Sequence, residues 1–189
     1  IVFGNLDTRI RTIAALPQTG AGIRAIPILQ DLLADENPLL REAACESILG
    51  ITGGIGTVLI VPFLKTESDV NVTFSALRAL GRTKSPRAVM ALLPFLEHGN
   101  EDLVVVALEG LAKLQCTAIV DPLAARLKDP RWRVRVATLE AIAELKIDSL
   151  RDPVAAVLND EDAFVRQAAI QALAAISKPA QFAASATTL

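Results

Sequence analysis

Apolar and small residues recur along this chain at the three- and four-residue spacing of amphipathic helices. In residues 165–173 they stand at Val165, Ala168, Ala169, Ala172 and Leu173. The same pattern returns upstream at 134–142, 103–111, 72–80 and 40–48, so the step between copies is nearly constant. A degenerate copy lies around residues 9–16. The register predicts six equivalent helices.

A second helix is predicted between successive copies, because apolar positions recur there with the same period. Its core positions are leucines in five copies: Leu32, Leu64, Leu96, Leu127 and Leu158. Ser85, Thr117 and Asp148 stand where its N-cap is expected, each with a short side chain that can accept a backbone N–H bond. Each unit therefore reads as helix, turn, helix, turn in about 31 residues, a period typical of solenoid proteins.

Two of the copies carry a resemblance to a known family. LKDPRWRVRVATLEAIAEL (residues 127–145) and LNDEDAFVRQAAIQALAAI (residues 158–176) resemble the short HEAT-like repeat first associated with phycobilisome lyases. The resemblance extends over nearly the whole chain. It implies an all-α fold, a right-handed α-solenoid of five to six two-helix repeats. It says little about function, because this repeat serves many unrelated roles.

The repeat register also gives an expected domain organisation. We expect a single HEAT-like array over residues 1–178, followed by a tail at 179–189. The expected repeats lie near residues 7–34, 35–66, 67–97, 98–128, 129–159 and, as a partial copy, 160–178.

An aspartate and an arginine share a six-residue spacing across the turn into the first helix of three repeats. The pairs are Asp35/Arg41, Asp129/Arg135 and Asp160/Arg166. The resemblance implies that these positions form a ladder tying one repeat to the next, and a carboxylate and a guanidinium can make charge-assisted bonds there. The third and fourth repeats depart from the pattern at both positions, with Glu67/Thr73 and His98/Val104.

Composition argues against chemistry in this chain. The sequence has 52% hydrophobic but only 4% aromatic residues and a net charge of −2, so no global field attracts nucleic acid or an anionic membrane. Its single histidine, His98, falls in a predicted loop, Cys45 falls on a core column and Cys116 lies near a turn. Because nucleophilic catalysis needs a base beside the nucleophile, we expect no enzyme and no catalytic, cofactor-binding or metal-binding residues.

Two sets of residues are candidates for binding a partner. Phe63 and Phe95 occupy one column of the second helices, where they form either an exposed apolar patch or part of the core. The other set is the basic stretch with a tryptophan: Arg126, Arg131, Trp132 and Arg133. A tryptophan among arginines could bind an acidic protein surface or stack on a nucleic-acid base. The third alternative is that these residues are solvated charges with no binding function.

These observations favour a non-catalytic scaffold that binds another protein on the concave face of the solenoid. We expect a cytoplasmic monomer that does not enter a membrane, since the apolar runs are far shorter than the ~20 residues that a spanning helix needs. The alternatives are a bilin lyase-like or chromophore-handling protein, suggested by the repeat family alone, and nucleic-acid binding through residues 126–135.

Overall fold

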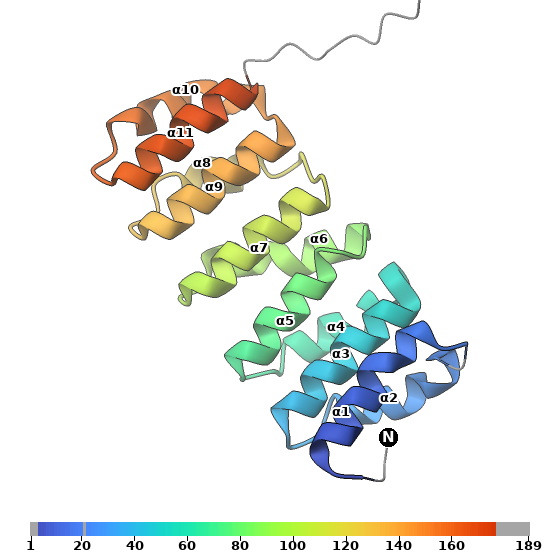
Figure 1. The fold of residues 1–189 in the computed structure, drawn as a ribbon. Coiled ribbons are helices and arrows are strands. Elements are labelled where there is room, and N and C mark those ends of the chain that lie inside the picture. The colour runs from blue at the N-terminus through green and yellow to red at the C-terminus, as the bar shows by residue number, and fades with distance from the viewer. Residues whose placement is uncertain (1–3, 21, 177–189) are drawn as a thin grey trace, which may run out of the picture. The chain divides into compact units, whose positions relative to one another are not determined.

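The computed structural model describes residues 4–20 and 22–176, in which every regular element is a helix. The chain divides into two compact units, unit 1 (Ile1–Cys116) and unit 2 (Thr117–Leu189). Both units are built from the alternating first and second helices of two-helix repeats, so the chain is an all-α solenoid of the predicted kind (Figure 1). Because the chain divides in this way, the single array over residues 1–178 remains a prediction. The predicted tail, residues 179–189, lies outside the described residues.

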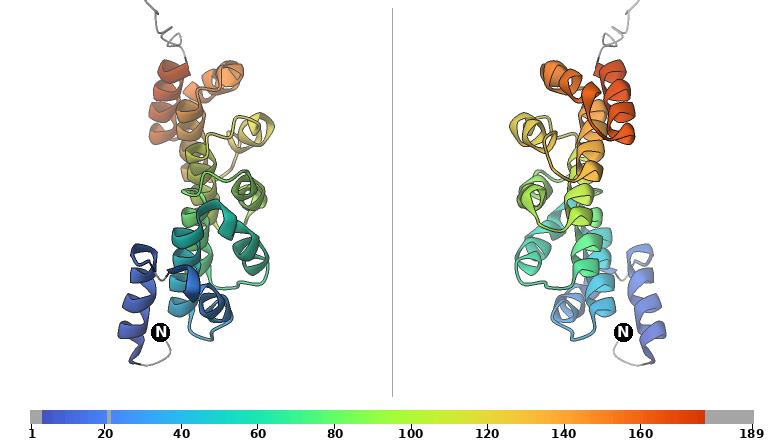
Figure 2. Two further views of the ribbon diagram at one scale, coloured as in Figure 1. Left: turned by 90° about the vertical axis from the view of Figure 1, so that its right-hand side faces the viewer. Right: turned by 90° about the vertical axis from the view of Figure 1, so that its left-hand side faces the viewer.

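Unit 1 contains four first helices: α1 (Leu6–Ala15), α3 (Pro38–Thr52), α5 (Val70–Leu80) and α7 (Glu101–Lys113). Its second helices are α2 (Ile26–Leu32), α4 (Thr57–Leu64) and α6 (Pro86–Leu92), accompanied by the 3-10 turns η1 (Leu16–Gln18), η2 (Gly22–Ala25), η3 (Gly53–Gly56) and η4 (Leu93–Glu97). Helix α3 packs against α1 and α5, and α5 packs against α7. Figure 2 shows the second helices of this unit in a layer beside α3, α5 and α7.

Unit 2 contains the first helices α9 (Trp132–Leu145) and α11 (Ala163–Ile176), which pack against each other. Its second helices are α8 (Val120–Arg126) and α10 (Arg151–Ala156), with the 3-10 turns η5 (Asp148–Leu150) and η6 (Val157–Asn159). Helix α8 packs on α9, and α10 packs on α11. The unit is therefore built on the same two-helix plan.

Short polar side chains start the first helices. Asn37, Asp69 and Asn100 occupy the N-cap positions of α3, α5 and α7, and each accepts a hydrogen bond from a backbone N–H in the first turn. Asp162 accepts such bonds at the start of α11. These contacts satisfy N–H groups that have no partner inside the helix. The apolar register alone does not define the first residue of each helix, and these N-cap contacts do.

Small residues let α5 and α7 approach closely. A Cβ built on Gly81, at the end of α5, would lie 2.7 Å from the Cα of Gly110 in α7. Gly110 stands in the column that carries Ala79, Ala141 and Ala172 in other repeats. The small-residue column seen in the sequence therefore corresponds to a real backbone contact in unit 1.

One segment of the described chain, Pro38–Leu64, is long and apolar enough by composition to cross a membrane. The structure divides it into α3 and α4 around Gly53, whose φ of +57° is a left-handed conformation. Helix α3 has 15 residues and α4 has 8, so each is shorter than the ~20 residues of a spanning helix. Both contribute buried residues to the core of unit 1.

Candidate binding surfaces

The turns before α3, α5, α7, α9 and α11 are closed by one recurring contact. In each of these turns, a side chain accepts a hydrogen bond from the backbone N–H of the residue two positions later in the sequence. The acceptors are Asp35, Glu67, His98, Asp129 and Asp160, and the donors are Asn37, Asp69, Asn100, Arg131 and Asp162. Carboxylates and an imidazole nitrogen thus serve the same local purpose.

The ladder arginines connect each turn to the following repeat. In unit 1, Nη1 of Arg41 donates to the backbone carbonyls of Asp35 and Glu36, at 2.9 and 3.0 Å. Its Nε and Nη2 donate to the carboxylate of Glu67, in the turn of the next repeat, at 2.7 and 2.9 Å. These bonds lower the pKa of Glu67 below its usual value. The guanidinium therefore reaches its own turn and the next one together.

Unit 2 repeats this arrangement. Nη1 of Arg135 donates to the carbonyls of Asp129 and Pro130, and its Nη2 donates to Asp160 at 2.8 Å. Burial alone would raise the pKa of Asp160, but hydrogen bonds from Arg135 and from the backbone N–H of Asp162 outweigh it and lower the pKa.

The predicted departure at Glu67 is wrong, because Glu67 is the carboxylate partner of Arg41. The sequence spacing predicted that Arg41 pairs with the carboxylate six residues before it. In the structure Arg41 donates to the backbone carbonyls of that turn and forms its ion pair with a carboxylate of the next repeat. The pattern lapses instead at Thr73, which is buried and donates its hydroxyl to the carbonyl of Asp69. No buried charge is left unpaired by that replacement.

Two arginines of the basic stretch are bound to one carboxylate. The side chain of Asp129 is 1% exposed and accepts from Nε and Nη2 of Arg131, both at 2.8 Å, and from Nη1 of Arg126 at 3.1 Å. The bond from Arg131 is the main cause that lowers the pKa of Asp129. Arg126 and Arg131 are therefore both engaged by Asp129 within unit 2, and this one carboxylate balances one of their two positive charges.

Trp132 lies in a different setting from these arginines. It is the first residue of α9, is 42% exposed, and stacks on Phe164 of α11 with ring centroids 5.5 Å apart and planes 27° apart. Phe164 is 68% exposed, and Arg133 beside Trp132 is also exposed. Sequence reasoning missed Phe164. Its signal was an aromatic residue in a column that is polar in three other repeats, at Asn71, Asp102 and Arg133.

The two phenylalanines of the second helices do not form an exposed pair. Phe63 is buried in α4, whereas Phe95 in η4 is half-buried with its ring 5.8 Å from that of His98. The core alternative therefore describes Phe63. An apolar patch shared by both residues is not available to a partner on this face of unit 1.

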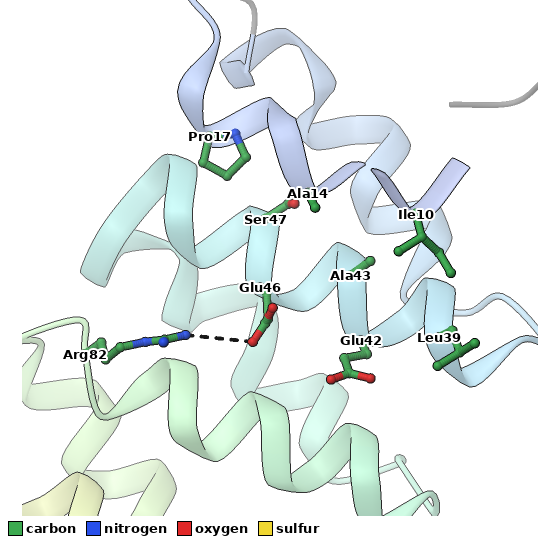
Figure 3. Close-up of a pocket in the computed structure, with 9 residues that line it drawn as sticks. All are labelled: Ile10, Ala14, Pro17, Leu39, Glu42, Ala43, Glu46, Ser47 and Arg82. Carbon is green, nitrogen blue, oxygen red and sulfur yellow. Dashed lines mark ion pairs between the residues drawn. The ribbon is translucent and has the colours of Figure 1, made fainter. Parts of the chain in front are cut away.

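A groove of about 400 Å³ lies between α1 and α3 in unit 1 (Figure 3). Ile10 and Leu39 line it with apolar surface. Glu46 on its floor pairs with Arg78 at 3.2 Å and with Arg82 at 3.8 Å, so its charge is balanced from α5 and the following turn. The groove therefore offers a surface of mixed apolar and charged side chains.

A second groove, in unit 2, runs between α8 and the α10–η6 segment and has a volume of about 460 Å³. Its walls are mostly apolar, with Leu127, Pro153 and Val157. Lys128 supplies a positive charge, and Asp160, which also lines the groove, is paired with Arg135.

Cys45 and His98 lie in separate local settings in the described part of the chain. No set of three or more His, Cys, Asp or Glu residues is placed to share a metal ion within it. Cys45 is buried, and that burial raises the pKa of its thiol well above the usual range. His98 uses Nδ1 to accept from the backbone of Asn100.

The fold and the arginine ladder define a helical repeat protein of the solenoid class. Three families match its sequence: HEAT repeats over residues 120–184, HEAT repeat over residues 25–54, and PBS lyase HEAT-like repeat over residues 74–98. The chain is a HEAT-like repeat protein. No curated protein matches it.

Solved structures share this fold at low identity. An engineered protein is 20% identical with a TM-score of 0.60, and the match covers 93% of this chain and 92% of that one. The complex of CpcE and CpcF of phycocyanin lyase from Nostoc sp. PCC7120 is 18% identical with a TM-score of 0.68, covering 82% of this chain and 65% of that one. A designed armadillo repeat protein in complex with the peptide (KR)4 is 16% identical with a TM-score of 0.60, covering 90% and 92%.

Proposed function

We propose that this chain is a non-catalytic scaffold that binds another protein. The observation that carries the proposal is the stacked pair Trp132 and Phe164, two large aromatic side chains that remain exposed on unit 2. Exposed aromatic groups beside arginine are typical of the residues that contribute most to protein interfaces. The proposed surface lies at the start of α9 and α11, on the first helices of unit 2.

Known relatives of this fold support binding as the general role. The designed armadillo protein is seen with a peptide, and CpcE is seen in complex with CpcF. In this chain the described acidic and basic groups of the ladder are already paired with one another or with backbone groups. The exposed aromatic pair, by contrast, belongs neither to the ladder nor to the buried core.

The test compares affinity capture from the native cell by the wild-type chain and by a Trp132→Ser, Phe164→Ser double variant. We expect the double variant to lose a captured protein while its melting temperature changes by less than about 2 °C, because exposed substitutions cost little stability. A Met90→Ser, Ile55→Ser variant is the matched control, since these side chains are 71% and 77% exposed without forming an aromatic pair. Equal capture by all three proteins would contradict the proposal.

Handling of a bilin chromophore is the second candidate, favoured by one observation in unit 2. The apolar groove between α8 and α10 has a positive group, Lys128, that could pair with a propionate. Similarity to the PBS lyase HEAT-like repeat and to phycocyanin lyase makes this chemistry worth testing. Incubation with a bilin would shift its absorption spectrum if the groove binds it, and a Lys128→Ala variant would reduce the shift. An unchanged spectrum would remove this candidate.

A further inference from the structure

Unit 1 carries a group of cations at one end of its helices. Arg24, Arg82, Lys84 and Arg87 are exposed, and they lie in the turns that join a first helix to the second helix of the same repeat. These turns span residues 16–25, 50–57 and 80–87, and none of them contains Asp or Glu. The three turns together are called the basic edge below.

The three turns pack on one another, so the basic edge is one continuous surface. A Cβ built on Gly22, in the first turn, would lie 3.1 Å from Cγ1 of Ile51, in the second. A Cβ built on Gly54, also in the second turn, would lie 2.8 Å from Cβ of Ser85, in the third. Cations of different repeats are therefore carried side by side on adjoining turns.

Arg24 and Arg87 occupy equivalent positions on this surface. Each lies five residues before a fully buried leucine of a second helix, Leu29 in α2 and Leu92 in α6. Both arginines are at the N-terminal end of that helix, where the helix dipole disfavours a positive charge. Neither forms an ion pair within residues 4–20 and 22–176. Stability of the fold therefore does not account for a cation at these two places.

Charge in unit 1 is divided between the two ends of its helices. At the basic edge, Glu46 pairs with Arg82 at 3.8 Å, and it also pairs with Arg78 at 3.2 Å. Acidic residues gather where a second helix is followed by the next first helix: Asp35, Glu36, Glu67, Asp69, Glu97, Glu101 and Asp102. The net charge of −2 therefore conceals a positive end of unit 1.

We propose that the basic edge binds an acidic segment of another protein. Carboxylates of that segment pair with Arg24, Lys84 and Arg87, and an apolar side chain between them contacts Ile23, which is 71% exposed beside Arg24. Complementary charges of this kind set the orientation and the rate of association of two proteins. The inference rests on protein binding as the general role, but it uses a surface of unit 1 in place of the aromatic pair of unit 2.

A polypeptide fits the basic edge better than a nucleic acid does. The three turns contain no aromatic residue, so a base finds no ring on which to stack. A phosphate backbone would leave Ile23 without an apolar contact, whereas an acidic segment can supply one from a neighbouring residue. The mixture of cations and an exposed isoleucine therefore favours a protein.

The experiment titrates the full chain with two fluorescent peptides and follows their anisotropy. In the first peptide Glu and Leu alternate, and in the second Gln replaces every Glu. We expect the wild-type chain to bind the Glu peptide at least about tenfold more tightly, with a difference that shrinks as salt is added. An Arg24→Gln, Arg87→Gln variant should bind the Glu peptide about tenfold more weakly, because two ion pairs are lost.

A Lys65→Gln, Lys146→Gln variant is the matched control. It changes the net charge by the same amount at two exposed lysines outside the basic edge, and its affinity should stay within about twofold of wild type. Equal weakening by both variants would overturn the inference, because net charge alone would then explain binding. The Trp132→Ser, Phe164→Ser variant should bind the Glu peptide as wild type does, so failure of either proposal is distinguishable from failure of the other.

Three further measurements decide between the occupants. Tighter binding of duplex DNA than of the Glu peptide, lost in the Arg24→Gln, Arg87→Gln variant, would overturn the inference in favour of a nucleic acid. Self-association of the wild-type chain that this variant abolishes would overturn it in favour of a second copy. The melting temperature of the variant should stay within about 2 °C of wild type, and a fall of more than about 4 °C would overturn the inference, because the two arginines would then serve the fold.

Discussion

Arg41 donates two hydrogen bonds to Glu67, through Nε at 2.7 Å and Nη2 at 2.9 Å. The equivalent pair in unit 2 has only one, from Nη2 of Arg135 to Asp160. Nε of Arg135 is buried and has no partner among the described residues. The aspartate is one methylene shorter than the glutamate, which accounts for the missing second bond.

Replacing Glu67 by Asp should destabilise the chain, whereas replacing Asp160 by Glu should not. Glu67→Asp is expected to lower the free energy of unfolding by about 1 kcal/mol, because one charge-assisted bond to a mostly buried arginine is lost. Asp160→Glu is expected to leave it unchanged or raise it by up to about 1 kcal/mol, since the longer side chain can reach Nε of Arg135. Urea unfolding of both variants checks this. A larger loss for Asp160→Glu than for Glu67→Asp would contradict it.

The ladder also predicts a loss of stability in acid. The pKa values of Glu67, Asp129 and Asp160 are depressed in the folded chain below their ordinary values of 4.5, 3.8 and 3.8. Groups with depressed pKa values stabilise the fold above their unfolded pKa and cease to do so as pH falls through the folded pKa. The free energy of unfolding should therefore be level near neutral pH and should fall below about pH 4. A Glu67→Gln, Asp160→Asn variant should show a shallower fall, and an identical pH profile would refute the assignment.

The contact of Gly81 with Gly110 should tolerate no side chain at position 81. Gly81→Ala would place a Cβ 2.7 Å from the backbone of α7, so we expect a loss of about 2 kcal/mol or more. Gly110→Ala would meet the flexible end of Leu92 at 3.0 Å and would gain helix propensity, so its net cost should stay within about 1 kcal/mol. Gly99, with no atom within 4 Å of a built Cβ, is the control. Thermal melts would expose an error if Gly81→Ala and Gly99→Ala behaved alike.

The burial of Phe63 separates it from Phe95 in a mutational test. Phe63→Ala should cost about 3 kcal/mol, the usual loss for a buried phenylalanine. Phe95→Ala should cost about 1 kcal/mol, because this side chain is half-exposed. Chemical unfolding of the two variants measures the difference. Near-equal small losses would return Phe63 to the list of candidate surface residues.

Helix positions were predictable from the sequence because one register runs through the chain. The first helices begin at a nearly constant interval, at Leu6, Pro38, Val70, Glu101, Trp132 and Ala163. The apolar columns predict this spacing, because the apolar face of every first helix carries its residues at the same positions of the repeat. HEAT-like repeats were therefore recognisable from the residues alone.

The interactions of the charged residues were less predictable. A spacing of six residues links Asp129 and Arg135, but the arginine takes the carbonyl of Asp129 while the carboxylate pairs with Arg126 and Arg131. Sequence position does not say which end of a residue an arginine will reach. The stack of Trp132 on Phe164 joins residues of two successive repeats, and only the packing of α9 on α11 brings them together.

The closure of five turns by a side chain two residues before its backbone donor has an evolutionary consequence. The contact is made within one short segment by Asp, Glu or His, so a copied segment of one repeat carries a finished turn with it. A duplication or deletion in steps of one repeat would leave every remaining turn intact. Gene rearrangement could therefore lengthen or shorten this chain, and only the arginine–carboxylate pairs on either side of the junction would have to adapt.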